Sequence, residues 1–331
     1  MPQITLTSGK SFENNAQNSI LDDAKRAGIS LPYSCKTGRC SSCKCRVVKG
    51  NSKALYDETS LSNLEKEAGW ILSCVRSSIT DLLLEVEDLG DIAIPAVKTL
   101  PCRIDHIEEV APHVIRVLLR LPPSNEFEFI PGQYIDVIGP NGIRRSYSLA
   151  NTDFKNKRLE LHIKEFSGGA MSDYWFSTAK PNDLLRINGP LGTFFLRNVA
   201  DLDLVFLATG TGIAPVKAML EHIPNLIREQ QPRSVTVVWG AREENDLYLN
   251  SILSQGQHHY IPTLSRASEQ WLGDRGYVQQ VVLAKFPNLS NVTVYACGSE
   301  IMIESAKECL TKAGLPNSRF HSDAFVCSAT V

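Results

Sequence analysis

Residues 35–45 read Cys-Lys-Thr-Gly-Arg-Cys-Ser-Ser-Cys-Lys-Cys, and one more cysteine, Cys74, follows further along the chain. The first three cysteines have the spacing C-x4-C-x2-C, which together with a distant fourth thiolate is typical of a [2Fe–2S] site. A loop that aims three sulfurs at one cluster must curl tightly, and Gly38 with the two serines supplies the small residues that this requires. Cys45 is left over. We expect the cluster ligands to be Cys35, Cys40, Cys43 and Cys74.

Two other uses of these cysteines compete with the cluster. A structural zinc site would fit Cys40 and Cys43 and would recruit Cys35 or Cys45, but such a site usually has a second tight pair of cysteines or histidines. Disulfides are the other use, yet the chain has nine cysteines, an odd number, and Met1 is followed by polar sequence rather than an apolar signal segment. We therefore expect a cytoplasmic location, where thiols stay reduced and free for metal.

Composition places the chain among soluble multidomain proteins. At 331 residues it is long enough for two or three domains, and its 43% hydrophobic and 21% charged residues are ordinary for globular folds. The longest apolar runs, such as 203–209, have the length of a strand, so we expect no membrane span. A formal charge of −2 gives no reason to expect nucleic acid or a membrane as partner. The domains are expected at residues 1–92, 99–198 and 202–331.

The first ninety residues predict a small mixed sheet with short helices, which is an α+β fold. The expected strands are 3–7, 10–12, 45–49 and 82–86, and residues 70–74 return the fourth cysteine to the loop. Helices are expected at 20–27, capped by Asn18 or Ser19, and at 61–68. The segment 88–101 contains Gly90, Pro95 and Pro101 and is predicted to be a linker.

Strands dominate the middle hundred residues and predict an antiparallel β-barrel. They are expected at 102–107, 114–119, 133–138, 145–149, 159–164 and 184–187. One of them carries Arg145-Ser-Tyr-Ser148, whose side chains suit a flavin: an arginine can neutralise pyrophosphate, a tyrosine ring can stack, and a serine hydroxyl can reach flavin N5. An ordinary barrel strand is the alternative for so short a motif. Ser167 to Asp173 then opens a predicted helix whose N–H groups suit a phosphate.

From Leu202 onward, strands and helices alternate and predict a parallel, doubly wound α/β sheet. The expected strands are 204–208, 234–239, 260–264 and 292–296, and the expected helices are 215–229, one near Leu247, 277–286 and 301–313. Ligands should collect at the carboxyl ends of the strands. Thr209-Gly-Thr-Gly-Ile-Ala-Pro215 follows the first strand as a turn of close approach, and Cys297-Gly-Ser299 ends another strand.

Residues 1 to about 90 resemble a plant-type ferredoxin, whose fold is a β-grasp, on the quoted cysteines. The remainder resembles a ferredoxin–NADP⁺ reductase-type module, on Arg145-Ser-Tyr-Ser148, the glycine turn after Thr209 and Cys297-Gly-Ser299. This resemblance implies an enzyme, a flavo-iron–sulfur oxidoreductase that binds a [2Fe–2S] cluster, FAD and NADH. Hydride is expected to pass from nicotinamide to FAD, and single electrons through the cluster to an acceptor protein.

The resemblance also assigns roles to residues. It implies that the hydride step depends on Tyr147, Ser148 and Cys297. FAD contacts are expected from Arg145, Ser146, Tyr147, Ser148, His162, Gly169, Ala170, Met171, Ser172 and Phe325. Nucleotide contacts are expected from Gly210, Thr211, Gly212, Ile213, Pro215, Gly240, Arg242, Ser265, Arg266, Cys297 and Gly298. An exposed strand histidine is the alternative for His162, and a buried structural cysteine is the alternative for Cys297.

The acceptor is the least constrained part of this interpretation. The chain resembles most the reductases that serve CDP-6-deoxyhexulose-3-dehydrase in 3,6-dideoxysugar synthesis, which belongs to lipopolysaccharide (O-antigen) biosynthesis. A component of a bacterial oxygenase is the rival acceptor, and a non-catalytic binding module is a remote alternative. Ser265 and Arg266 suit NADPH as well as NADH, and NADH is favoured.

The cluster loop is basic in sequence. Between Lys25 and Lys53 there is no Asp or Glu, and the basic residues are Lys25, Arg26, Lys36, Arg39, Lys44, Arg46, Lys49 and Lys53. We expect these side chains to meet an acidic patch on the acceptor protein, because exposed charges steer encounter between proteins. A solvated loop that offsets a negatively charged cluster is the alternative.

Overall fold

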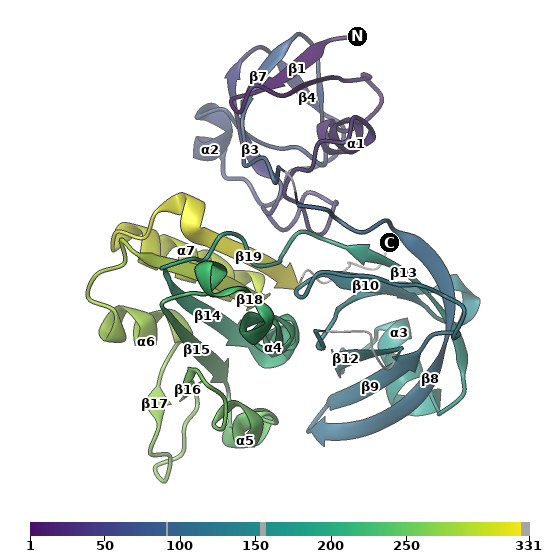
Figure 1. The fold of residues 1–331 in the computed structure, drawn as a ribbon, viewed down its shortest axis with the longest axis vertical. Coiled ribbons are helices and arrows are strands. Elements are labelled where there is room, and N and C mark those ends of the chain that lie inside the picture. Colours follow the sequence, from purple (N-terminus) through teal and green to yellow (C-terminus); the bar gives the residue numbers. More distant parts are fainter. Residues whose placement is uncertain (91, 153–156, 326–331) are drawn as a thin grey trace. The chain divides into compact units, whose positions relative to one another are not determined.

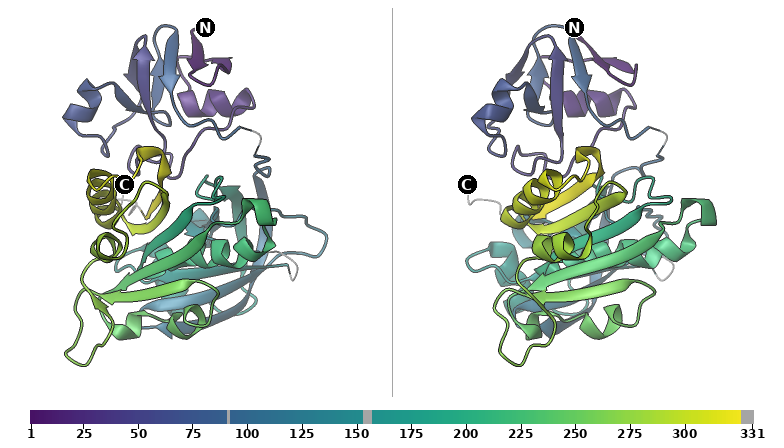
Figure 2. Two further views of the ribbon diagram at one scale, coloured as in Figure 1. Left: turned by 60° about the vertical axis from the view of Figure 1, so that its left-hand side comes forward. Right: turned by 90° about the vertical axis from the view of Figure 1, so that its left-hand side faces the viewer.

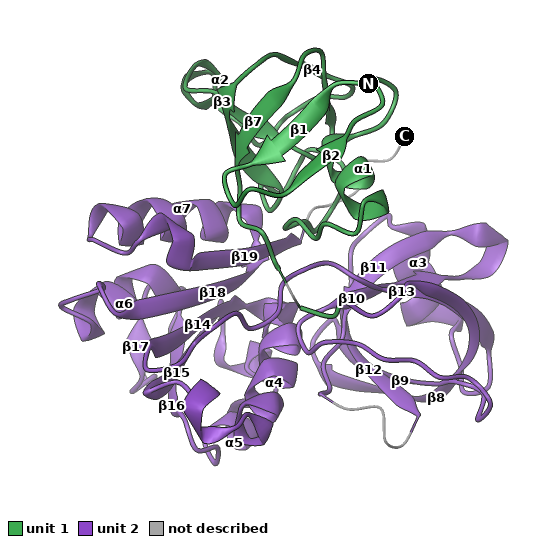
Figure 3. Cartoon of the chain, turned by 45° about the horizontal axis from the view of Figure 1, so that its top comes forward, with its two compact units in different colours: residues 1–93, 326–331 green, residues 94–325 purple. Residues whose placement is uncertain are grey.

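The structure is a computed structural model that describes residues 1–90, 92–152 and 157–325. The described chain divides into two compact units, residues 1–93 and 94–325 (Figure 3). Within the described residues, no helix combines the length and the apolar character needed to cross a membrane.

The first unit contains a five-stranded mixed sheet in the order β2-β1-β7-β3-β5. Figure 1 labels β1, β7 and β3 of this sheet. Its strands are β1 (Gln3–Leu6), β2 (Ser11–Glu13), β3 (Lys44–Lys49), β5 (Trp70–Leu72) and β7 (Leu82–Glu85). β1 is parallel to β7, and the other neighbours are antiparallel. A second ladder joins β4 (Ser52–Ala54) to β6 (Arg76–Ser78). The predicted mixed sheet with short helices is confirmed.

Two short helices accompany this sheet. Helix α1 (Ile20–Arg26) is capped by Ser19, whose hydroxyl accepts the N–H of Asp22 at 3.1 Å. Its buried face includes Ile20, Leu21 and Ala24, and each large apolar side chain so buried stabilises the fold by about 2 kcal/mol. Helix α2 (Asn63–Glu67) buries no residue and depends on a capping box between Ser62 and Glu65.

The second unit begins with a six-stranded antiparallel sheet in the order β11-β10-β13-β8-β9-β12. Its strands are β8 (Lys98–Ala111), β9 (Val114–Arg120), β10 (Tyr134–Ile138), β11 (Arg144–Ser148), β12 (Arg158–Lys164) and β13 (Leu184–Leu191). A bridge between Leu149 and Leu161 joins the two ends of the sheet, so the strands close into the predicted barrel. The barrel interior is filled by aliphatic side chains such as Ile104, Leu119 and Ile187.

The predicted linker is shorter than expected. Residues 98–101 already belong to β8, where Pro101 pairs with Arg186 of β13. Proline is tolerated in a strand where its missing N–H faces no neighbour. Pairing of β8 with β9 starts only at Arg103, so Pro101 lies where β8 has one partner strand.

The rest of the second unit is a six-stranded parallel sheet in the order β17-β16-β15-β14-β18-β19. This part of the chain is coloured from green to yellow in Figure 2. Its strands are β14 (Asp203–Thr209), β15 (Ser234–Ala241), β16 (His259–Leu264), β17 (Asp274–Arg275), β18 (Val292–Ser299) and β19 (Phe320–Phe325). Its helices are α4 (Ile213–His222), α5 (Asn250–Leu253), α6 (Val278–Lys285) and α7 (Glu300–Lys312). The doubly wound class is confirmed, and β14 lies near its centre.

Two predicted features of this sheet need correction. The helix predicted at 215–229 begins at Ile213 and ends at His222, because Pro224 has no N–H to donate to the carbonyl four residues earlier, and a 3-10 turn at Ile223–Asn225 follows instead. Strand β19 was not predicted, because Phe320 to Phe325 contains His, Ser and Asp and lacks a continuous apolar run. It forms the edge of the sheet, parallel to β18.

Candidate functional site

The four cysteines predicted as ligands lie together as two thiol pairs. The sulfurs of Cys43 and Cys74 are 3.2 Å apart, although β3, β4, α2 and β5 separate them in sequence. The thiols of Cys35 and Cys40 are hydrogen-bonded to each other. Because a [2Fe–2S] cluster is held by four thiolates on two irons, two thiol pairs fit it. Among the described residues, no three His, Cys, Asp or Glu side chains gather around a point that would hold one metal ion.

Backbone N–H groups of the loop are directed at these sulfurs. The N–H of Thr37 donates to the Cys35 sulfur at 3.4 Å, and the N–H of Cys35 donates to the Cys40 sulfur at 3.4 Å. The hydrogen bond from the Cys40 thiol, aided by Thr37 and opposed by burial, lowers the pKa of Cys35 to about 5. Such bonds stabilise thiolate, which is the form that binds iron.

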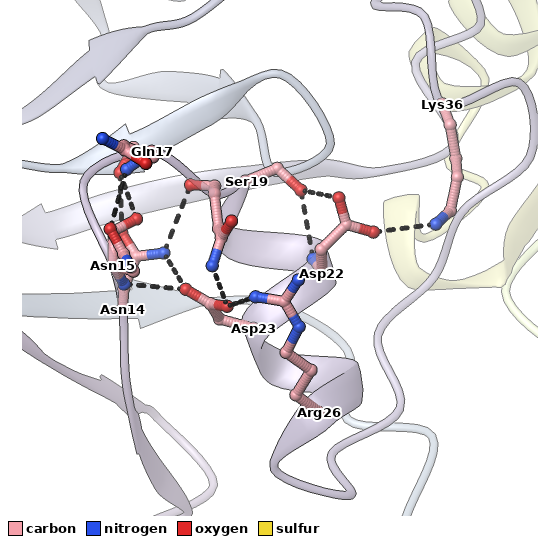
Figure 4. A network of polar contacts seen from close by, with 10 residues as sticks. Asn14, Asn15, Gln17, Ser19, Asp22, Asp23, Arg26 and Lys36 are labelled. Carbon is pink, nitrogen blue, oxygen red and sulfur yellow. Dashed lines mark hydrogen bonds and ion pairs between the residues drawn. The ribbon is translucent and has the colours of Figure 1, made fainter.

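The loop adopts unusual backbone angles that α1 helps to hold. Lys36 and Ser41 have φ of 58° and 57°, and Gly38 has φ of 77°. A non-glycine residue in this left-handed region costs about 1–2 kcal/mol, so other contacts must offset it. The ammonium of Lys36 pairs with Asp22 at 2.9 Å, and Asp22 accepts the hydroxyl of Ser19 at 2.7 Å (Figure 4). Helix α1 thus holds the first turn of the cysteine loop.

Cys45 lies outside both thiol pairs. Its side chain is buried within β3, and burial raises its pKa to about 12. The neighbouring N–H of Ser73 donates to the carbonyl of Cys43 at 3.1 Å. The thiol of Cys45 is therefore neutral, and its exclusion from the ligand set stays a prediction.

The basic loop has acidic partners in space, so the expectation that it lacks a local acid is wrong. The ammonium of Lys44 pairs with Glu65 of α2 and lies 4.7 Å from the centre of the Trp70 ring. Arg46 lies 4.0 Å from Glu85 of β7. These acids come from segments outside residues 25–53, which is why the sequence of the loop concealed them. The exposed basic residues with no carboxylate partner in the described chain include Lys49 and Lys53.

A hollow of about 250 Å³ opens beside Cys74. Polar residues at the start of α1 line it together with Leu55 and Tyr56, and Tyr56 is 73% exposed. This hollow could not be predicted from the sequence, because its walls come from four separate segments.

Strand β11 presents the predicted flavin motif on the barrel. The hydroxyl of Tyr147 accepts a hydrogen bond from the indole N–H of Trp175 at 3.0 Å, and the two rings meet edge to face at 83°. Burial raises the pKa of Tyr147 to about 12. The hydroxyl of Ser146 donates to Asp136 at 2.6 Å. Trp175, which was not among the predicted site residues, therefore fixes the ring of Tyr147.

Two other side chains of the motif, those of Ser148 and Arg145, form no hydrogen bond or ion pair with another side chain in the described chain. Ser148 is buried at the end of β11, and its hydroxyl has no partner in the described chain. The guanidinium of Arg145 donates to the carbonyl of Arg144 at 2.8 Å and forms no ion pair within the described residues. An unpartnered hydroxyl and an unpaired guanidinium on one strand fit the polar edge and the pyrophosphate of a flavin nucleotide.

The helix predicted after Ser167 is shorter than expected. Only α3 (Ala170–Asp173) is α-helical, and a π-helical turn, η2 (Tyr174–Thr178), continues it. Met171 is buried in the barrel core, and the hydroxyl of Ser172 accepts the N–H of Phe166 at 2.7 Å. The π turn positions Trp175 inward, against Tyr147.

His162 is buried within β12, so the alternative of a histidine facing water is wrong. One ring nitrogen contacts Glu160 at 2.8 Å, and the other contacts the Tyr248 hydroxyl at 3.1 Å. Burial lowers the pKa of His162, although Glu160 opposes the shift. Lys217 of α4 pairs with Glu160 at 3.3 Å and donates to the carbonyl of Ala150 at 3.0 Å. Both nitrogens of His162 thus have protein partners, and its contact with FAD stays a prediction.

The two predicted nucleotide motifs are in direct contact. A side chain at Gly212 would lie 2.2 Å from the carbonyl oxygen of Cys297, and one at Gly298 would lie 2.2 Å from the Thr209 hydroxyl. Only glycine permits this approach at either position, and Gly298 also has φ of 148°. Burial, followed by the charge of Asp323, raises the pKa of Cys297 well above its usual value. Its thiol is therefore neutral and fully buried beside the glycine turn.

The remaining nucleotide residues surround this turn. Thr211, Ile213 and Pro215 are buried at the start of α4. The indole N–H of Trp239 donates to the carbonyl of Gly210 at 3.0 Å. A side chain at Gly240 would lie 2.7 Å from Val278.

Arg242 and Arg266 follow the adjacent strands β15 and β16. The N–H of Arg266 donates to the carbonyl of Arg242 at 3.0 Å, so their backbones are neighbours. Both residues are exposed and lack an ion pair within the described residues. Ser265 donates its hydroxyl to the carbonyl of Ala241 at 3.3 Å. Phe325 ends β19 and is 39% exposed.

Three known domain families match consecutive parts of the chain. The family described as 2Fe-2S iron-sulfur cluster binding domain matches residues 4–76. An oxidoreductase FAD-binding domain matches residues 101–196, and an oxidoreductase NAD-binding domain matches residues 206–308. The first match favours the cluster over the zinc alternative.

Complete proteins with the same domain order are also similar. The CDP-6-deoxy-L-threo-D-glycero-4-hexulose-3-dehydrase reductase of Yersinia pseudotuberculosis is 39% identical over 97% of both chains. The phenol hydroxylase P5 protein of Acinetobacter pittii is 31% identical over 99% of this chain and 95% of its own. A crystal structure of a cytochrome P450 reductase from Amycolatopsis has a TM-score of 0.73 and 26% identity, covering 98% of this chain and 99% of its own. The chain therefore belongs to the family of flavo-iron–sulfur reductases in which a plant-type ferredoxin domain precedes an FAD- and NAD-binding module of the ferredoxin–NADP⁺ reductase type.

Proposed function

We propose that this chain is the NADH-dependent reductase of a CDP-6-deoxyhexulose-3-dehydrase in 3,6-dideoxysugar synthesis. The observation that carries the proposal is the 39% identity to such a reductase across all three domains. The rival acceptor, an oxygenase component, is supported by the weaker identity of 31% to the phenol hydroxylase protein. The paired thiols and the contacting nucleotide motifs argue against a non-catalytic module, because both sites retain their geometry.

We assign the hydride step to Tyr147, Ser148 and Cys297. The edge contact from Trp175 holds the Tyr147 ring in one orientation, which prepares it to stack on a planar ring system. The unpartnered hydroxyl of Ser148 is suited to hydrogen-bond flavin N5, and Arg145 is suited to bind pyrophosphate. Bound FAD supplies the conversion of a two-electron hydride into single electrons. The buried, neutral thiol of Cys297 offers a small wall beside nicotinamide that excludes water.

We further assign Cys35, Cys40, Cys43 and Cys74 as the four cluster ligands. The pairing of their thiols and the N–H groups directed at their sulfurs support this assignment. Compensation of negative charge by such N–H groups is a general feature of iron–sulfur sites.

We favour NADH as the hydride donor, with Arg242 and Arg266 near the adenosine ribose. The two unpaired guanidinium groups are also the feature that would suit the 2′-phosphate of NADPH. Comparison of kcat/KM for NADH and NADPH decides between them. A preference for NADPH that Arg266→Ala abolishes would overturn the choice of NADH.

The proposed location is a reducing cytoplasm. All eight cysteines of the described chain have free thiols, which supports it. Thiolate ligands must stay reduced to bind iron.

The acceptor is tested by reconstitution with purified partners. With NADH in excess, the chain is expected to support turnover of a CDP-6-deoxyhexulose-3-dehydrase at a far higher rate than reduction of an oxygenase component. Reduction of ferricyanide serves as the control, because a small dye accepts electrons without a docking surface. If the ferricyanide activity is the same in both assays and only the oxygenase component turns over, the oxygenase component is the acceptor.

A further inference from the structure

Residues 57–60, here called the buttress segment, lie directly against the three-cysteine loop. The N–H of Ser60 and the hydroxyl of Thr59 both donate to the carbonyl of Gly38 at 3.3 Å. A side chain at Gly38 would lie 2.2 Å from the carbonyl oxygen of Asp57. The loop therefore packs on the buttress segment with no space between them.

The same segment holds the turn that carries the fourth cysteine. The carboxylate of Glu58 accepts the N–H of Leu72 at 2.9 Å and the Nε–H of Arg76 at 3.0 Å. Leu72 and Arg76 stand two residues before and two residues after Cys74. One carboxylate thus bridges both sides of this turn.

Glu58 is an unexpected residue at this place. Its side chain is only 3% exposed, and burying a carboxylate is costly unless every lone-pair direction finds a donor. Both of its oxygens have donors, and Arg76 is itself anchored by the Ser52 hydroxyl at 3.0 Å. Buried ion pairs often add little net stability. The main effect of the Glu58–Arg76 pair is therefore to fix the position of the turn that carries Cys74.

We propose that Glu58, together with Arg76, is a positioning residue that keeps Cys74 in register with the three-cysteine loop and so controls cluster retention and reduction potential. The proposal rests on the assignment of Cys74 as a cluster ligand. Glu58 touches none of the four ligand sulfurs in the contacts described above. Glu58 acts through the backbone of Leu72 on one side. On the other side, its neighbours Thr59 and Ser60 hold the backbone of the loop at Gly38.

The first measurement is the rate of iron release to a chelator from the complete holoprotein. Glu58→Gln keeps the volume of the side chain but presents at most one acceptor to two donors, and Arg76→Met leaves the Glu58 carboxylate unpaired. Loss of one buried hydrogen bond to a charged group changes an equilibrium constant about tenfold or more. Each variant is therefore expected to lose iron at least about tenfold faster than the parent. Glu85→Gln is the matched control, because its partner Arg46 is 4.0 Å away and both side chains are more than half exposed.

The second measurement is the reduction potential of the cluster, which separates positioning from a general loss of stability. Glu58→Gln leaves an unpaired positive charge near Cys74 and is expected to raise the potential, whereas Arg76→Met leaves a negative charge and is expected to lower it. The double variant should return close to the parent value. General destabilisation would not produce shifts of opposite sign.

Glu58→Asp covers the case in which Glu58→Gln does not fold. Its shorter side chain keeps the charge but cannot reach both donors, so faster iron release without a raised potential is expected. Iron release at the Glu85→Gln rate, or potentials that shift in one direction in all variants, would overturn the role of Glu58. Absence of iron from the parent chain would instead refute the proposed cluster function itself.

Discussion

At the scale of single residues, Cys45 is a direct test of the ligand set. Its sulfur is buried and belongs to neither thiol pair. Cys45→Ser should keep the full iron content and the visible spectrum, because serine has nearly the shape of cysteine and the four ligand thiols are unchanged. Cys74→Ser should lose most of both. Elemental analysis of the two purified variants checks this, and iron loss in Cys45→Ser alone would refute the assignment.

Ser148 tests the hydride step. Removing its hydroxyl should slow reduction of the flavin by NADH about threefold to tenfold, the usual worth of one hydrogen bond, while FAD stays bound. Stopped-flow absorbance gives the rate and the spectrum gives the FAD content. Ser254→Ala is the control, because the Ser254 hydroxyl donates to the carbonyl of Asn250 within its own turn. Identical rates for Ser148→Ala and parent would remove Ser148 from the mechanism.

The ligand cysteines could be predicted from sequence because spacing alone constrains a loop that wraps a cluster. The acidic partners of Lys44 and Arg46 could not, since Glu65 and Glu85 reach them only after α2 and β7 have packed. Trp175 and Glu58 were missed for the same reason: their partners lie 28 and 14–18 positions away in sequence.

At the scale of elements, Lys217 joins α4 to the barrel. Its ammonium contacts Glu160 of β12 and the carbonyl of Ala150, two residues after Ser148, while α4 starts at the glycine turn. Lys217→Met should destabilise the second unit by about 2–3 kcal/mol, because the half-buried carboxylate of Glu160 loses its ammonium partner and keeps only His162. It should also slow flavin reduction, since the two motifs lose a shared anchor.

Chemical unfolding and stopped-flow reduction check both effects of Lys217→Met. Lys285→Met is the matched control, because Lys285 is half exposed and 3.8 Å from Asp274, and it should change stability by less than about 0.5 kcal/mol. Equal free energies of unfolding for the two variants would show that the contact of Lys217 in α4 with the barrel does not stabilise the second unit.

Periodicity predicted most elements of the fold but not their ends. The long strands of the barrel and of the parallel sheet have clear apolar patterns, whereas α3 stops after one turn and continues as a π turn that the sequence does not announce. Strand β19 is interrupted by polar residues in sequence and is recognised only through its pairing with β18.

At the scale of the whole molecule, Lys49 and Lys53 test the docking of the acceptor. Both are exposed and lack a carboxylate partner in the described chain, unlike Lys44. Reversing both charges should lower the rate of electron transfer to an acceptor with an acidic patch and should weaken its dependence on salt, as the Debye length shrinks from about 30 Å to about 8 Å. Activity of NADH with ferricyanide should not change. A rate of electron transfer to the acceptor that changes neither with salt nor with the charge reversals at Lys49 and Lys53 would contradict this docking.

The central claim is the linear order of nicotinamide, FAD, cluster and acceptor protein. Mild removal of iron from the purified chain, with FAD retained, tests it most directly. The iron-free protein is expected to reduce ferricyanide with NADH at close to the parent rate, whereas turnover of the acceptor protein is expected to stop and to return when the cluster is rebuilt. Loss of ferricyanide reduction on removal of iron, or continued turnover of the acceptor without it, would contradict that order.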